Sequence, residues 1–317
     1  MASLRALKNV SLLPRARCYA TSSARWSASA AAAPTLPAFT TLTVSPLPQQ
    51  PLVFEVVLSR PAAANAMTSG MFSELEAAFT ALGARAHPCR AIVLRGAGKM
   101  FSAGLDLVEH APLLAGGGGG GGGGDPARRA WLLRDTITAY QRSVNAVEAC
   151  LKPVIAAVHG GCIGGGVDLV AAADIRVASG CAYFAVAEAQ LGLAADLGSL
   201  QRLPAIMGSD SLAREMALTA RRVAADEALR AGLLSAVLVD AQALLVHAHA
   251  LAARIAALSP VAVQGTKLCM NFSRGRPAGD GLAFTAAHNA AMLQTSDIAA
   301  AAGAAFGGKA AASFPPL

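Results

Sequence analysis

Aromatic and charged residues are both scarce in this sequence, at 5% and 14% of its 317 positions, whereas 54% of them are hydrophobic. A chain of this length and composition can bury a sizeable core in one large domain or two ordinary ones. Even so, no uninterrupted apolar run approaches the roughly 20 residues that a membrane-spanning helix needs. We therefore expect a protein without a membrane span.

Cysteine and histidine patterns that bind metals are also missing. The six cysteines form no CxxC pair and fit no small disulfide framework, which predicts buried or idle thiols in a reducing compartment. His247 and His249 are two residues apart, so on a helix they would point in different directions and could not share a metal ion. No Ser-His-Asp or Cys-His signature of nucleophilic catalysis occurs. The sequence thus predicts no metal site.

No acidic residue precedes Glu55, although five basic residues stand within the first 34 positions. Those five account for most of the formal net charge of +7, because 21 basic and 19 acidic residues remain without them. This near equality of basic and acidic residues argues against a nucleic-acid partner. Residues 1–34 are rich in Arg, Ser and Ala, a composition typical of an organellar transit peptide, with a merely disordered N-terminus as the alternative.

The ends of the chain bear on its expected location. No long apolar segment follows the N-terminal charges, which disfavours a secretory signal, and we predict a mitochondrial rather than a plastid address. Residues 313–317 read SFPPL and lack the S-K-L tripeptide of peroxisomal proteins. The predicted location is the mitochondrial matrix, ahead of the peroxisome. Residues 35–51 are rich in Pro, Thr and Ser and are predicted to be a linker.

Short apolar strands alternate with helices early in the chain, and helices dominate its end. This order predicts an α/β core over residues 52–258 and a helical C-terminal region over residues 259–317. The nine glycines Gly116–Gly124 interrupt the core and are predicted to be a flexible surface insertion. Strands are expected at 52–58, 90–94, 153–158 and 235–239, and helices at 69–82, 126–149, 167–173, 209–220, 224–231, 241–258, from 259 and from 278.

The most informative stretch is 152–203, in which an apolar strand is followed by the glycine clusters 160–161 and 164–166. These glycines lack the register of the dinucleotide fingerprint G-x-G-x-x-G, and no P-loop lysine follows them. Clustered glycines also let backbone N–H groups approach a ligand oxygen at a helix N-terminus. The turn 102–105 would offer a second N–H, and two such donors make an oxyanion hole. Tight packing of two turns is the alternative, and spacing alone leaves both open.

Three acids of this stretch, Asp168, Glu188 and Asp196, stand among Gly, Ala, Val and Leu with no basic neighbour. Taken singly, each carboxylate is explained by helix capping, and Asp196 before Leu197-Gly198-Ser199 is a plausible N-cap. Burying three unpaired acids for structure alone is expensive, however, so together they favour acid–base chemistry. In an apolar pocket their pKa values would rise, and we predict that one of the three is protonated near neutral pH.

Several long motifs of the chain resemble the crotonase family, also called the enoyl-CoA hydratase/isomerase family. They are FSAGLDL (101–107), KPVIAAVHGGCIGGGVDLVAAADIR (152–176) and SPVAVQGTK (259–267), and the resemblance runs from about Leu52 to the C-terminus. It implies an α/β fold, a crotonase-like spiral of ββα units with a helical C-terminal trimerisation region, assembled as a homotrimer or hexamer. It also implies an acyl-CoA thioester substrate, with CoA as part of the substrate and no separate cofactor.

The resemblance assigns a role to each candidate residue. The backbone amides of Leu105 and Gly165 would form the oxyanion hole for the thioester carbonyl. Glu188 would remove a proton from C2 and Asp196 would deliver one at C6, while Asp168 would be a third carboxylate in the pocket. CoA would lie near Arg60, Asn65 and Met67, and the substrate contacts would be Ser102, Ala103, Gly104, Leu105, Asp106 and Gly165.

Within the family, the segments GGGVDL (164–169) and LGLAADLGSLQRL (191–203) resemble the branch that isomerises 3,5-dienoyl-CoA to 2,4-dienoyl-CoA in fatty-acid β-oxidation. Moving two conjugated double bonds shifts a proton across several bonds, so two separate carboxyls are useful. A true enoyl-CoA hydratase is the nearest alternative, although it would carry a second glutamate where this chain has Asp168. A non-catalytic CoA- or RNA-binding member of the fold is the alternative from another class, disfavoured by the presence of all three acids.

Overall fold

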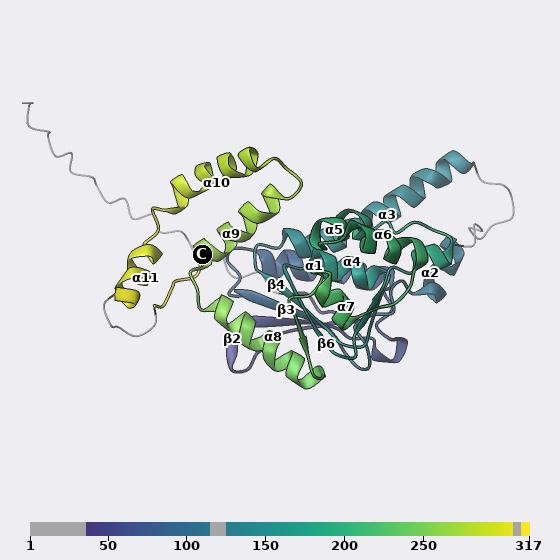
Figure 1. Cartoon of the computed structure of the whole chain (residues 1–317), viewed down its shortest axis with the longest axis horizontal. Coiled ribbons are helices and arrows are strands. Elements are labelled where there is room, and N and C mark those ends of the chain that lie inside the picture. The colour runs from purple at the N-terminus through teal and green to yellow at the C-terminus, as the bar shows by residue number, and fades with distance from the viewer. Residues whose placement is uncertain (1–35, 115–124, 307–311) are drawn as a thin grey trace, which may run out of the picture. The chain divides into compact units, whose positions relative to one another are not determined.

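The computed structural model describes residues 36–114, 125–306 and 312–317, so the predicted transit peptide and the nine-glycine tract lie outside the described residues. Within the described part, a six-stranded sheet runs in the order β1-β2-β3-β4-β6-β9 (Figure 1). The β1–β2 pair is antiparallel and every other neighbouring pair is parallel. The strands of this sheet are β1 (Leu42–Leu47), β2 (Gln50–Leu58), β3 (Ala91–Gly96), β4 (Val154–Val158), β6 (Ile175–Ser179) and β9 (Ala236–Leu238).

Helices cover both faces of the sheet, as the near-continuous apolar strands require. The helices of the described residues are α1 (Ser69–Gly83), α2 (Leu107–Leu114), α3 (Pro126–Ala149), α4 (Gly165–Ala172), α5 (Ser199–Ile206), α6 (Asp210–Thr219), α7 (Ala225–Arg230), α8 (Ala241–Ala256), α9 (Pro260–Ser273), α10 (Ala278–Met292) and α11 (Asp297–Phe306), with the 3-10 turns η1 (Pro61–Ala63) and η2 (Glu188–Leu191).

Successive side chains of each strand point to opposite faces of the sheet. In β3, the buried Val93 belongs to the face that α8 covers, and the buried Leu94 belongs to the other face. On α8, Leu244 and three alanines recur every four residues, and these small side chains let the helix approach the strands closely. The α/β core predicted from the alternating pattern is confirmed.

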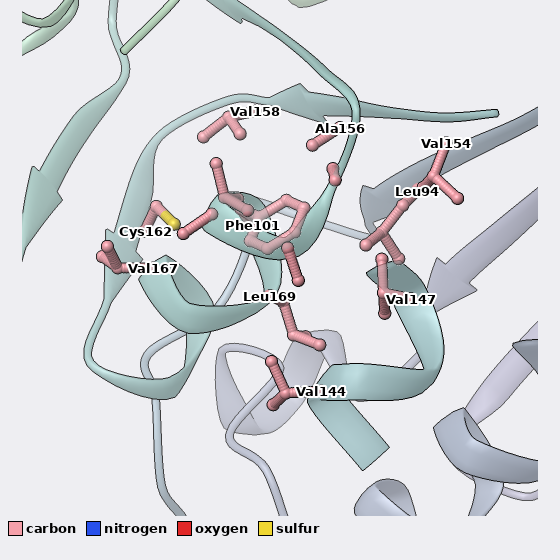
Figure 2. Close-up of a cluster of buried hydrophobic side chains, with 14 of the residues drawn as sticks. Leu94, Phe101, Val144, Val147, Val154, Ala156, Val158, Cys162, Val167 and Leu169 are labelled. Carbon is pink, nitrogen blue, oxygen red and sulfur yellow. The ribbon is translucent and has the colours of Figure 1, made fainter. Parts of the chain in front are cut away.

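The second face is covered by α1, α3 and α4 and carries the larger part of the core. Figure 2 shows part of this cluster, with Phe101 among side chains from β3, β4, α3 and α4. Phe101 is fully buried and comes directly before the turn 102–105, so the core fixes the position of that turn. The other labelled members are Leu94, Val144, Val147, Val154, Ala156, Val158, Cys162, Val167 and Leu169.

A three-stranded sheet in the order β5-β7-β8 stands beside the main one, formed by β5 (Gly161–Ile163), β7 (Tyr183–Ala185) and β8 (Val223–Ala224). Two isolated bridges attach the turn 102–105 to its surroundings, one between Ser102 and Cys162 and the other between Met67 and Leu105. The glycine-rich segment after β4 therefore lies against the turn after β3.

The predicted linker at residues 35–51 is wrong in its second half, where Leu42–Leu47 forms the edge strand β1. The segment is tied down from its start, since the Glu74 carboxylate accepts hydrogen bonds from the backbone N–H and hydroxyl groups of both Thr40 and Thr41 at 2.6–2.9 Å. Most side chains of β1 are exposed or half-buried. Its polar composition thus reflects an edge position rather than a lack of structure.

An ion pair between the buried Lys267 and the half-buried Asp174 fastens α9 to the main sheet. The Lys267 ammonium donates to Asp174 Oδ2 at 2.7 Å and to the Lys152 carbonyl at 3.1 Å. The same Asp174 oxygen accepts the N–H of Val154 at 2.7 Å, at the first residue of β4. The C-terminal helical region predicted from residue 259 is therefore helical and bonded to the core through α9.

No single helix in the described ranges is both long and apolar enough to cross a membrane; only α8 and α9 pass that test together, as a pair bent by 108°.

Candidate active site

A cavity of about 500 Å³ opens where the turns after β3 and β5 meet α2, α3 and η2. Leu105, Gly165, Glu188 and Asp196 all line it. Most of its remaining wall is apolar, formed by side chains such as Leu133 and others of α2, α3 and η2. The structure thus brings these four predicted residues, from three separate segments, to one cavity.

The two backbone amides predicted as oxyanion donors are positioned differently from their neighbours. Gly165 is the first residue of α4, so its N–H has no partner within the helix. The bridge to Met67 uses the Gly104 carbonyl and the Asp106 N–H, at 2.7 and 2.9 Å. Because amide direction alternates along an extended chain, the Leu105 N–H points away from Met67. Both N–H groups therefore remain available to a ligand oxygen.

Two positions beside these amides require glycine. Gly104 has φ +84°, and a Cβ there would lie 2.8 Å from the Ile163 carbonyl oxygen. Gly164 has φ +50°, and its Cβ would lie 3.0 Å from Glu188 Oε1. Positive φ disfavours residues with a Cβ; at Gly104 the Cβ would also collide with the Ile163 carbonyl, and at Gly164 it would press on the Glu188 carboxyl. The tight packing and the donor function that the sequence left open are therefore compatible in one structure.

Asp168 differs from the other two acids, because it does not line the cavity. Its side chain belongs to α4, is 1% exposed, and accepts the N–H of Ser199 at 2.5 Å through Oδ1. Ser199 is the first residue of α5, so Asp168 satisfies the N-terminus of a neighbouring helix. The expectation of a third pocket carboxylate is thus corrected: Asp168 stands behind the pocket wall.

The structure excludes the alternative that Asp196 caps a helix. The N-cap of α5 is Gly198, which has no side chain, and Asp168 supplies the carboxylate from another helix. Asp196 instead lines the cavity, and its own carbonyl accepts the side-chain amide of Gln141 at 2.7 Å. The Asp196 carboxyl is therefore free of the capping role that its sequence context suggested.

Burial raises the pKa values of all three carboxyls. Glu188 reaches about 7, chiefly because burial penalises its charged form and secondarily because Asp168 is negative. Burial raises the pKa of Asp168 to about 6, against the lowering effect of the hydrogen bond from the Ser199 backbone. Burial also raises the pKa of Asp196. Within the described residues, Glu188 Oε2 and Asp168 Oδ2 are buried oxygens without a hydrogen-bond partner.

The predicted substrate contacts divide into three groups. Ala103, Gly104, Leu105 and Gly165 line the cavity. Ser102 is fully buried and does not line the cavity; its hydroxyl donates to the Asn65 carbonyl at 2.9 Å and accepts the Gly104 N–H at 3.1 Å, which braces the turn.

Asp106 and the predicted CoA-binding segment adjoin a second, more open cavity. Asp106 lines it together with Arg60, to which it is paired at 2.8 Å. Leu107 borders both cavities. Asn65 and Met67 are fully buried and do not line this cavity; the Asn65 amide donates to three carbonyls of the segment 97–101 and holds the turn from behind.

One wall of the main cavity comes from α2 and α3 and was not anticipated. His110 Nδ1 donates to the Asp106 carbonyl at 2.8 Å, which leaves His110 Nε2 to accept the Tyr140 hydroxyl at 2.8 Å. Leu133, Ile137 and Tyr140 line the cavity at helical spacing, and that spacing was the available signal. Trp131 of the same helix is 61% exposed and does not line the cavity.

Comparison with known proteins identifies relatives of this chain. Residues 49–305 match the family model described as enoyl-CoA hydratase/isomerase. The human mitochondrial Delta(3,5)-Delta(2,4)-dienoyl-CoA isomerase is 49% identical over 246 residues, 78% of this chain and 74% of that protein. The peroxisomal isomerase of the same name from Arabidopsis thaliana is 40% identical, over 78% of this chain and 87% of that protein.

Solved structures share the fold. The crystal structure of an enoyl-CoA hydratase from Bacillus anthracis superposes with a TM-score of 0.76 at 28% identity, covering 87% of this chain and 99% of the other. The family match spans well over half of the chain, and it includes both turns and all three acids. The chain belongs to the enoyl-CoA hydratase/isomerase family.

Proposed function

We propose that this protein is a dienoyl-CoA isomerase that converts 3,5-dienoyl-CoA thioesters to 2,4-dienoyl-CoA thioesters. The observation that carries the proposal is the presence of two carboxyls, Glu188 and Asp196, on one cavity that also holds the Leu105 and Gly165 amides. The names of the human and Arabidopsis relatives support the same substrate class.

The reaction requires one proton to leave C2 and one to arrive at C6. The Glu188 carboxylate takes the C2 proton, and the electron pair moves into the thioester as an enolate. The N–H groups of Leu105 and Gly165 stabilise the enolate oxygen, and loss of one such donor typically costs about 2.7–4 kcal/mol of barrier. The electrons then return through the diene, and C6 takes the proton of Asp196.

The raised pKa values suit these two roles. A base with a pKa of about 7 is ionised in a large fraction of molecules at neutral pH and still binds a proton well. Burial favours the protonated form of Asp196, which is the form that donates. After one turnover Glu188 is protonated and Asp196 is ionised, so the site returns to its starting state by exchanging protons with water.

A hydratase needs a second carboxylate that reaches a water molecule in the pocket. Asp168 occupies that place in the sequence, but it does not line the cavity and is bonded to the start of α5. This observation favours isomerisation over hydration.

The test is to assay purified protein with a 3,5-dienoyl-CoA, following the absorbance of the dienoyl thioester, and with a 2-enoyl-CoA, following hydration. Faster hydration than isomerisation would refute the proposed function.

The finer assignments of location and assembly are part of the same proposal. We assign residues 1–34 to mitochondrial import, in line with the human relative named mitochondrial. A fluorescent fusion should lose its mitochondrial location when these residues are removed.

We also assign trimeric or hexameric assembly to the C-terminal helices, where Met270, Leu282 and Leu293 expose more than half of their surface. Light scattering that finds a monomer would refute this assembly.

A further inference from the structure

The segment 196–199, which carries Asp196, is held by groups outside it. Gln141 of α3 donates to the Asp196 carbonyl at 2.7 Å, and the Ser199 N–H donates to Asp168. Arg202 of α5 donates through Nη1 to the Leu197 carbonyl at 3.5 Å, the longest bond of the three. All three bonds involve backbone atoms, so they set where the Asp196 carboxyl stands without contacting it.

Arg202 also rests on the backbone of this segment. Gly198 has φ +123°, and a Cβ at this position would overlap Arg202 Nη1. Glycine is therefore required here for two reasons, the backbone conformation and the guanidinium lying against it. The Arg202 side chain is only 11% exposed, so its charge needs partners within the protein.

Those partners lie on α3 and are in turn bonded to residues at the end of α9. Glu148 Oε2 accepts two hydrogen bonds from Arg202, from Nε at 2.9 Å and from Nη2 at 2.7 Å, and Asn145 Oδ1 accepts another from Nη2 at 2.6 Å. The other Glu148 oxygen, Oε1, accepts Arg274 Nη1 at 2.5 Å. Asn271 adds a bond from its amide to the Glu148 carbonyl at 3.0 Å. One carboxylate thus joins the start of α5 to the end of α9.

We propose that Arg202 is a positioning residue for Asp196, and that Glu148, itself held by Arg274, keeps Arg202 in place. The inference rests on the proposed function, because it concerns delivery of the proton at C6. Two partners on Arg202 fix the guanidinium plane, and that plane fixes the turn at Gly198 and the Leu197 carbonyl. The C2 half of the reaction uses Glu188 and the two amides, none of which bonds to Arg202.

The test separates the two halves of the reaction in the full-length protein. Arg202→Met should lower kcat for isomerisation on the order of 10²-fold, the usual cost of misplacing a catalytic group by about 1 Å. KM and the exchange of the C2 proton of the substrate with D2O should stay close to the wild-type values. Glu148→Gln should show the same pattern with a smaller loss, because the amide still accepts one N–H.

Arg95→Met is the matched control. Arg95 forms a similar paired contact with Glu55, through Nε at 2.8 Å and Nη2 at 3.0 Å, and is likewise partly buried. It lies on β3 and does not line the cavity, so the variant should lose stability without changing the ratio of C2 exchange to isomerisation.

Three results would overturn the positioning role. They are unchanged isomerisation in Arg202→Met, loss of C2 exchange in parallel with isomerisation, and an equal effect in Arg95→Met. If Arg202→Met fails to fold, Glu148→Gln is judged by the same criteria. A wild-type protein that does not isomerise the substrate refutes the proposed function and this inference with it, whereas an active wild type with unchanged variants refutes the inference alone.

Discussion

Glu188 combines an unpartnered carboxyl oxygen with a position on the apolar cavity, and burial raises its pKa to about 7. Only its ionised form can accept the C2 proton. We therefore expect kcat/KM to fall tenfold per pH unit well below pH 7, because protonation of the base inactivates the free enzyme. A pH–rate profile measures this directly. Activity that stays constant down to pH 5 would show that Glu188 is not the base.

Asp168 acts on that pKa from behind the wall, since its negative charge is the second cause of the rise in Glu188. The variant Asp168→Asn removes the charge, while its amide oxygen can still accept the N–H of Ser199. The acidic limb of the pH–rate profile should then move to lower pH. A limb that stays in place would mean that burial alone sets the pKa of Glu188.

Gly104 sets the direction of the Leu105 amide. In Gly104→Ala, the added Cβ would lie 2.8 Å from the Ile163 carbonyl oxygen, so the turn must shift. We expect kcat to fall 10²–10³-fold, the usual effect of losing one oxyanion donor. Gly275→Ala is the control, because Gly275 also has a positive φ, +71°, but has open space around it. Similar activity in the two variants would show that the Leu105 N–H is not an oxyanion donor.

At the scale of elements, helices were predictable where their first residues carry a cap. Thr68, Asp125 and Ser259 each accept a backbone N–H at the start of α1, α3 and α9, where the sequence placed those helices. The short strands β5 and β7 were not found, because three residues carry too little periodicity. Their pairing depends on the neighbouring turns rather than on their own composition.

The attachment of α9 is an element-scale feature with a measurable energy. The Lys267 side chain is 6% exposed and that of Asp174 is 21% exposed, so Lys267→Ala leaves a half-buried carboxylate without its charged partner. We expect the free energy of unfolding to fall by about 1–3 kcal/mol in chemical denaturation. Arg214→Ala, which breaks the exposed pair with Asp210, should cost less than about 1 kcal/mol. Equal losses would contradict the proposed role of Lys267.

At the scale of the whole molecule, the acids and glycines of the central stretch pointed to the site before their arrangement was known. The position of Asp168 outside the cavity was not predictable, because it depends on how the start of α5 packs beside α4. The wall formed by His110 and Tyr140 was also missed, since those residues are 30 apart and meet only through the packing of α2 on α3. Local sequence patterns thus predicted the kind of chemistry, whereas long-range packing determines which of these side chains line the cavity.

The central claim is that Glu188 and Asp196 divide one isomerisation between two ends of the substrate. The most direct measurement is to compare the wild type with Asp196→Asn on a 3,5-dienoyl-CoA in D2O. The wild type should form the 2,4-dienoyl product with deuterium at C6. In Asp196→Asn, product formation should fall about 10²–10⁴-fold, the usual contribution of a general acid, while recovered substrate still gains deuterium at C2. Product formation by Asp196→Asn near the wild-type rate would contradict the account.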